Sequence, residues 1–221
     1  MPAVNEKEAA SIELAAALFS ELSGEFVPHD PAMEEPARRL LEQRRDPETL
    51  LLKIIGLCGE PETPRQSYLC AAAYSRLGER YAEETIRCAE KYLVSPGWNE
   101  LEQREWTEGG IPIRGADACR ASLYCALAAA REIKDDLKGA YSALLKAYEL
   151  EPYRGDTMTK AADLLAALRG KREALDFVLE QRNSPYFKPV RYTDSFGKPQ
   201  RNESFRKQLE SEAEKLRKAK N

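Results

Sequence analysis

The single histidine and the five cysteines are the side chains best suited to metal binding or nucleophilic catalysis. His29 lies between Pro28 and Asp30 in a proline-rich stretch, and no second histidine exists to share a zinc site. Ser–His or Cys–His catalysis would therefore depend on His29 alone. No two cysteines form a CxxC pair. We predict a surface-loop histidine, no metal site, and free thiols in a reducing compartment at Cys58, Cys70, Cys88, Cys119 and Cys125.

Carboxylates are numerous, but no pair of them stands out as a general acid and base. Glu83-Glu84 and Asp135-Asp136 are expected on solvated faces or turns. The phosphate-binding patterns GxxxxGK[ST] and GxGxxG are absent, and Glu108-Gly109-Gly110 is typical of a turn. We predict no cofactor and no enzymatic activity. A small hydrolase or transferase stays a third hypothesis, which a polar pocket with perturbed carboxylates would support.

Composition favours helices that each have one solvated face. The chain has 221 residues, of which 43% are hydrophobic and 32% charged, with a net charge of −3. The charge is uneven, because Tyr186–Asn221 contains 10 basic and 5 acidic residues and the remainder has a net charge of −8. An acidic body makes nucleic-acid binding by the whole chain unlikely and gives the tail a distinct, basic character.

No stretch of the sequence is apolar enough to cross a bilayer. A spanning helix needs about 18 consecutive apolar residues, whereas the run Leu14–Phe19 is short and flanked by Glu13 and Glu21. The N-terminal MPAVNEKEAA lacks the basic start of a secretion signal. We predict a cytoplasmic protein with no membrane partner.

Apolar periodicity divides the chain into short helices separated by Gly and Pro. In the N-terminal part, we expect helices at 6–22, 35–44, 47–57, 65–77 and 81–94. Asp46-Pro47 is a strong helix start, since Asp caps the first turn and Pro fits within it. An irregular insert at 97–117 follows, in which Glu105–Thr107 and Ile111–Ile113 are predicted as a small hairpin. Helices resume at 118–133, 137–150, 157–168 and 172–182, and an extended stretch containing three prolines precedes a charged helix at 203–218.

The last two helical hairpins repeat each other with a period of 34 residues. A shift of that length places Leu127-Ala128 on Ala161-Ala162. The same shift places Tyr124 on Met158, Ala140 on Ala174 and Leu144 on Val178. Small residues let antiparallel helices approach, and large ones fill the adjacent gaps.

These positions resemble the tetratricopeptide repeat pattern. The segment Tyr124–Pro152 has the early aromatic, the large–small pair Leu127-Ala128, and Ala140, Leu144 and Ala147 before a terminating proline. The likeness extends over about 65–185 and implies an all-α, right-handed superhelix of TPR-like hairpins. Another helical-hairpin repeat and a compact bundle are the alternatives. We expect residues 1–64 to add a divergent first hairpin, and 186–221 to form an extended segment with a charged capping helix, whose apolar stripe is Phe205, Leu209, Ala213 and Leu216.

The resemblance implies a protein- or peptide-binding scaffold, because first helices line a groove in that family. Carried onto this chain, the groove positions that we select are Tyr68, Ser75, Arg76, Ser122, Glu132, Thr159 and Asp163. Trp98 and Trp106, in the insert, either fill this groove or form part of a binding surface, and we expect them to be mostly buried.

A single-stranded RNA binder is the alternative function. The tail mixes aromatic and basic residues around Tyr186-Phe187-Lys188 and Arg191-Tyr192, as single-strand binders do. We favour the other interpretation, in which these aromatics pack against the last hairpin and leave the cations in water. The sequence identifies neither the partner nor the oligomeric state.

Overall fold

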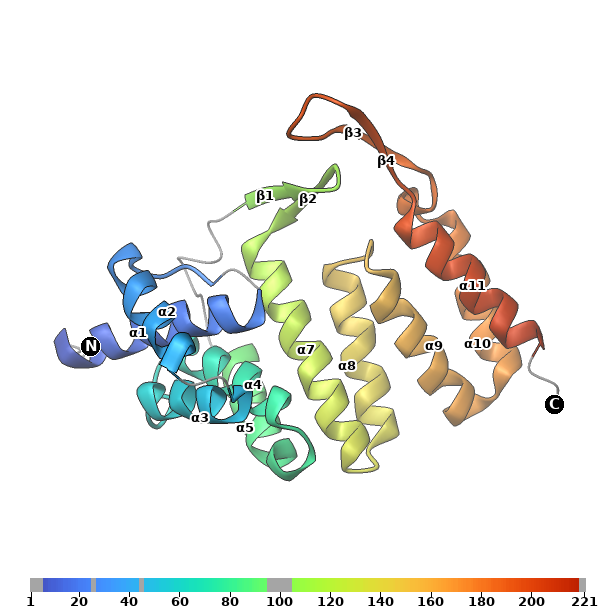
Figure 1. Ribbon diagram of the computed structural model, residues 1–221. Coiled ribbons are helices and arrows are strands. Elements are labelled where there is room, and N and C mark those ends of the chain that lie inside the picture. The colour runs from blue at the N-terminus through green and yellow to red at the C-terminus, as the bar shows by residue number, and fades with distance from the viewer. Residues whose placement is uncertain (1–5, 25–26, 44–45, 95–104, 219–221) are drawn as a thin grey trace. The chain divides into compact units, whose positions relative to one another are not determined.

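A computed structural model describes residues 6–24, 27–43, 46–94 and 105–218. They form mainly α-helices, with two small two-stranded sheets (Figure 1). The chain divides into two compact units, Met1–Glu102 and Gln103–Asn221. The predicted predominance of helices is confirmed, whereas the right-handed superhelix stays a prediction. No helix in the described ranges is long and apolar enough to cross a bilayer.

The first unit packs its N-terminal helix against two later ones. Its helices are α1 (Glu6–Ser23), α2 (Glu34–Gln43), α3 (Pro47–Cys58), α4 (Pro64–Leu77) and α5 (Ala82–Leu93), with 3-10 turns at Pro31–Met33 and Glu79–Tyr81. α1 buries Phe19 and its neighbours against α3 and α4, and α4 pairs with α5 as a hairpin. Asp46 caps α3 as predicted, because its carboxylate accepts from the amides of Glu48 and Thr49.

The second unit contains two consecutive helical hairpins. They are α7 (Gly115–Ile133) with α8 (Leu137–Leu150), and α9 (Gly155–Arg169) with α10 (Lys171–Glu180). The second helices begin 34 positions apart, at Leu137 and Lys171. The repeated positions are buried in both hairpins, except that Tyr124 is half-buried where its equivalent Met158 is fully buried. The repeat in the sequence is therefore a repeat in helix packing.

The last helix, α11 (Ser204–Lys218), packs on α9 and α10. Its predicted stripe is buried along its whole length, and Phe205 stacks on Tyr148 with 6.5 Å between the ring centroids. The prediction that this stripe docks the helix is confirmed. Two 3-10 turns, Gln181–Asn183 and Pro185–Phe187, lead from α10 into the tail.

Each of the two sheets is a β-hairpin. The predicted one pairs β1 (Glu105–Glu108) with β2 (Ile111–Arg114), and β2 leads directly into α7. The other pairs β3 (Val190–Thr193) with β4 (Pro199–Asn202). The pattern of prolines in the sequence predicts only extended chain there. The missed signal is the turn sequence Asp194–Gly197 between two short runs, with Gly197 at a φ of 76°.

Candidate binding face

The predicted groove positions of the second unit lie at the surface of α7 and α9. Glu132 and Asp163 are exposed, and Ser122 and Thr159 are half-buried. Thr159 Oγ1 donates to the carbonyl of Asp156 at 2.9 Å, which holds this side chain against the first turn of α9. These four positions are therefore accessible in the second unit, as a groove would require.

A shallow pocket of about 470 Å³ lies between α9 and α11. Two predicted positions, Thr159 and Asp163, form its α9 side. Its other side consists of α11 residues that the sequence analysis assigned only to a cap: Lys207, Gln208, Ser211, Glu212 and Lys215. Their spacing of one, three and four residues, along one flank of the apolar stripe of α11, was the signal that could have placed them on one face.

Charge in the pocket centres on Lys215. Its ammonium group donates to Asp163 and, at 3.3 Å, to Glu212 Oε2. The hydrogen bond to Asp163 raises the pKa of Lys215, and burial raises the pKa of Glu212. Glu212 Oε1 is buried 3.2 Å from Lys215 Nζ, but it accepts no hydrogen bond from the described residues. These charged groups of the pocket therefore pair with one another, and Lys215 links the two helices through Asp163 on α9 and Glu212 on α11.

Close helix contact at Gly155 keeps α11 beside α9. A Cβ atom at Gly155 would lie 2.1 Å from Gln208 Oε1 and 3.0 Å from Gln208 Cβ. Only glycine leaves room for the Gln208 side chain at this point. The Gln208 side chain thus packs against the start of α9 at a position that has no Cβ atom.

The predicted positions of the first unit are placed differently. Tyr68 is buried and packs near Tyr92, with 6.0 Å between the ring centroids. The Arg76 guanidinium lies 4.8 Å from the centroid of the Phe19 ring on α1, and Ser75 Oγ donates to the Ala72 carbonyl. Tyr68 therefore belongs to the interior of the unit, whereas Ser75 is half-buried and Arg76 is exposed.

The tryptophans of the insert divide between described and undescribed residues. Trp98 lies outside the described residues. Trp106, on β1, is 39% exposed, so the expectation of a mostly buried ring is wrong for it. The physical reason is that β1 is one strand of a two-stranded sheet, whose buried residues are Ile111 and Ile113 on β2.

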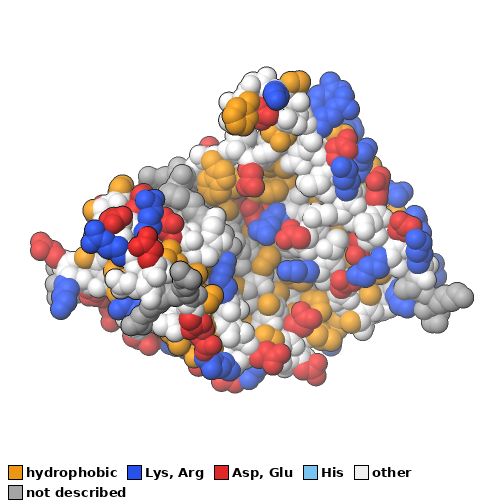
Figure 2. All heavy atoms as spheres, viewed as in Figure 1, with side chains coloured by type: hydrophobic (Ala, Val, Ile, Leu, Met, Phe, Trp, Pro, Cys, Tyr) orange, Lys and Arg blue, Asp and Glu red, His pale blue; other side chains and the backbone are white. Residues whose placement is uncertain are grey.

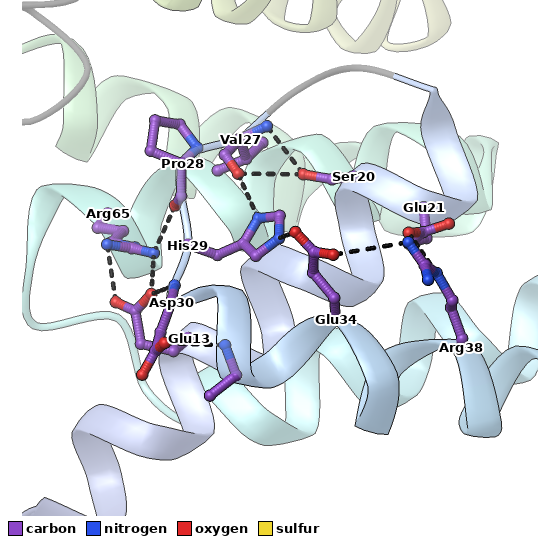
Figure 3. Close-up of polar contacts among 11 residues, drawn as sticks. Glu13, Ser20, Glu21, Val27, Pro28, His29, Asp30, Glu34, Arg38 and Arg65 are labelled. Carbon is purple, nitrogen blue, oxygen red and sulfur yellow. Dashed lines mark hydrogen bonds and ion pairs between the residues drawn. The ribbon is translucent and has the colours of Figure 1, made fainter.

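His29 is not a surface residue, contrary to the sequence prediction. Its side chain is 8% exposed, Nδ1 lies 2.7 Å from the Val27 carbonyl, and Nε2 lies 4.0 Å from Glu34 (Figure 3). The connector folds back because Ser20 on α1 accepts from the Val27 amide at 2.8 Å. Tertiary contacts, which the proline pattern does not specify, bury the ring.

Arg65 fastens the same connector to α1 and α4 (Figure 3). It donates to the Pro28 carbonyl at 2.7 Å and forms an ion pair with Glu13 at 2.9 Å. Glu13 also accepts from the Asp30 amide at 2.8 Å. Through these contacts, the polar groups around His29 bind the backbone of the connector. The cluster therefore stabilises the fold of the first unit.

A second buried polar cluster, missed in the sequence, lies at the α8–α9 turn. Glu151 accepts from the Tyr153 hydroxyl at 2.5 Å and from Arg154 at 3.2 Å. Arg154 also pairs with Asp156 at 3.2 Å. Burial raises the pKa of both Glu151 and Tyr153. Every charge here has a partner on the same turn, which fits a role in fixing where α9 begins.

The thiols behave as buried hydrophobes. Cys58, Cys70, Cys88 and Cys119 are buried, Cys125 is half-buried, and all are free, as predicted. Burial raises the pKa of Cys88 to about 11, so its thiol stays protonated at neutral pH. Within the described ranges, no three His, Cys, Asp or Glu side chains are grouped so as to hold a metal ion.

Comparison with known proteins gives one structural likeness. No protein-family model matches the chain, and no curated protein matches it in sequence. The crystal structure of MamA is similar with a TM-score of 0.47 and 12% sequence identity, over 86% of this chain and 94% of that one.

Proposed function

We propose that the chain is a non-enzymatic scaffold that binds a protein or peptide along the exposed face of α7, α9 and α11. The observation that carries this proposal is the pocket between α9 and α11, where repeat-related surface positions meet polar side chains of the last helix. Peptides present amide, carbonyl and charged groups, and the pocket offers the exposed ends of Lys215 and Asp163 beside the polar side chains of Thr159, Gln208 and Ser211. The resemblance to tetratricopeptide repeats supports the same use of the face.

Two features favour binding over catalysis. Glu212, the pocket carboxyl whose pKa is raised, is paired with Lys215 from its own helix, so its charge is compensated inside the protein. The pocket is also shallow, which suits an extended segment better than an enclosed small substrate. We place the scaffold in the cytoplasm, because buried free thiols suit a reducing compartment.

A photo-crosslinking amino acid at Ser211 tests the proposal. Ser211 lines the pocket, whereas its exposed neighbour Glu210 does not, so the same probe at Glu210 is the matched control. We expect a discrete crosslinked partner from Ser211 and not from Glu210. The purified partner should then bind the Ser211→Tyr variant about tenfold more weakly than the unmodified chain, while Glu210→Tyr binds normally. Equal crosslinking from both positions, or equal affinities, would remove the pocket from the binding face.

A further inference from the structure

The β3–β4 hairpin has one covered face and one open face. Val190 and Tyr192 lie against the turn of the other hairpin, because a Cβ atom at Gly110 would lie 2.8 Å from Tyr192 Cβ. Asn202, on the same face, donates to the Gly109 carbonyl at 3.3 Å. The opposite face is exposed and consists of Arg191, Thr193, Pro199 and Arg201. Figure 2 shows Lys and Arg side chains gathered over this hairpin and α11.

Two arginines stand directly opposite each other on the open face. Pro199 has no amide hydrogen, so its pairing with Thr193 is a non-hydrogen-bonded one. The pattern alternates, and Arg191–Arg201 is therefore also a non-hydrogen-bonded pair, in which side chains come closest. Like charges in this position destabilise a hairpin. Neither arginine forms an ion pair with any described residue, so an anion from outside would relieve their repulsion.

The same geometry leaves the outer edge of β3 open. Residues of non-hydrogen-bonded pairs direct their amide and carbonyl groups away from the partner strand, and in β3 these residues are Arg191 and Thr193. The sheet has only β3 and β4, so no described strand pairs with that edge. The edge of β4 is interrupted by Pro199. β3 is thus the edge to which an extended peptide can add.

We propose that an acidic peptide segment adds as a third strand along β3, with its carboxylates beside Arg191 and Arg201. Main-chain hydrogen bonds to Arg191 and Thr193 would fix its register, and alternate side chains would reach the guanidinium groups. This inference rests on the proposed function, in that the partner is a peptide or protein. It adds a second contact, of stated chemistry, to the α9–α11 pocket.

Single-stranded nucleic acid fits this surface less well. Base stacking needs several exposed aromatic rings, but the Tyr186 ring packs edge-on against Tyr153, and Phe187 packs on the core of the unit. Among the described aromatic residues of the tail, only Phe196 is largely exposed, at 86%. A peptide alone has the amide and carbonyl groups that match an open strand edge.

Fluorescence anisotropy with the full chain tests the proposal. The probe is a labelled peptide of about ten residues in which Glu and Thr alternate, long enough to cover one strand. We expect it to bind, and the double variant Arg191→Glu, Arg201→Glu to weaken binding at least about tenfold. That variant keeps a like-charge pair, so its hairpin should be about as stable as that of the unmodified chain. Lys138→Glu, Arg172→Glu makes the same charge change at exposed sites on α8 and α10 and should bind normally.

A second peptide separates strand addition from simple charge attraction. Methylation of the alternate amide nitrogens that face β3 keeps every carboxylate but removes the edge hydrogen bonds, and should weaken binding about tenfold. Unchanged affinity for the methylated peptide, or no binding of the Glu–Thr peptide, would overturn the proposal. So would tighter binding of an oligo-dT strand or of phosphatidylserine vesicles through the same arginines. Crosslinking from Ser211 with no peptide binding at β3 would reject only this inference and leave the scaffold function standing.

Discussion

The two β-hairpins of the second unit share a pattern of strand pairs but differ in side-chain chemistry. Both contain a Thr–Pro pair, Thr107 with Pro112 and Thr193 with Pro199. Two residues farther from each turn stands a charged pair, Glu105 with Arg114 in one hairpin and Arg191 with Arg201 in the other. The first hairpin therefore sets opposite charges against each other, where the second sets like charges.

The hairpins also differ in what anchors them. β2 buries Ile111 and Ile113, whereas no residue of β3 or β4 is fully buried. Apolar burial and charge pairing explain β1–β2 as a structural element. β3–β4 depends on its turn and on the contact with Gly110, and it keeps an unfavourable charge pair. The like-charge pair of β3–β4 is unfavourable, and no described contact within the molecule compensates for it. It therefore indicates a partner outside the molecule.

Truncation of Ile113 should have the largest effect. Ile113→Ala removes a buried side chain and leaves a cavity, so we expect the free energy of unfolding to fall by about 3 kcal/mol. Urea denaturation followed by circular dichroism measures this change. Thr193→Ala, at an exposed position of the other hairpin, is the control and should change stability by less than about 0.5 kcal/mol. Similar losses for both variants would show that the hairpins are anchored alike.

A methyl group at Gly110 should separate the two hairpins. Gly110 has a φ of 82°, and its new Cβ would lie 2.8 Å from Tyr192 Cβ, so we expect Gly110→Ala to cost about 2 kcal/mol. Gly197 has a similar φ of 76° but nothing within 4 Å of a new Cβ. Gly197→Ala should therefore cost only about 1 kcal/mol of backbone strain. Equal costs in thermal unfolding would mean that the contact between the hairpins contributes nothing.

Exchanging the charge pairs should shift stability in opposite directions. Arg201→Glu gives β3–β4 an opposite-charge pair and should stabilise that hairpin by about 0.5 kcal/mol. Arg114→Glu gives β1–β2 a like-charge pair, removes an ion pair with Asp117, and should destabilise it by a similar amount, about 0.5 kcal/mol. Amide hydrogen exchange at Tyr192 and Trp106 reports each hairpin separately. High salt should shrink both effects, and effects that persist at 1 M salt would contradict a charge mechanism.

Of the two hairpin turns, acid should loosen only the one between β3 and β4, and this is the smallest effect. Hydrogen bonds from the Lys198 amide, the Gln200 side chain and the Phe196 amide lower the pKa of Asp194 below 3.8. A carboxyl with a lowered folded pKa stabilises the fold above its unfolded pKa and loses that contribution as pH falls through the folded value. We expect the Lys198 amide resonance to titrate below pH 3.8, with the Gly109-Gly110 turn unaffected. Asp194→Asn should abolish the transition, and a transition that survives in this variant would assign it to another group.

Local signals explain how much of the fold the sequence predicted. Helix starts and stops such as Asp46-Pro47 and Gly170 depend on residues within one turn of the chain. The buried side of α11 is predicted by the spacing of its apolar residues. The β3–β4 hairpin was missed because its strands are four residues long and carry charges where a core-facing strand would be apolar. Short pieces of this kind are fixed by turn chemistry and by neighbours, not by periodicity.

The sequence by itself determined the helices, the 34-residue repeat, and the free thiols, because each depends on residues close together in the chain. Tertiary structure decided which side chains are buried and which are exposed at the surface. It buried His29 through Ser20 on α1, packed Tyr68 into the first unit, and left Trp106 exposed. It also brought Asp163 to Lys215 across 52 positions, and the pairing of β3 with β4 placed Arg191 opposite Arg201. Residues from separate elements become neighbours only when those elements pack together. The periodicity within one element therefore does not predict these contacts.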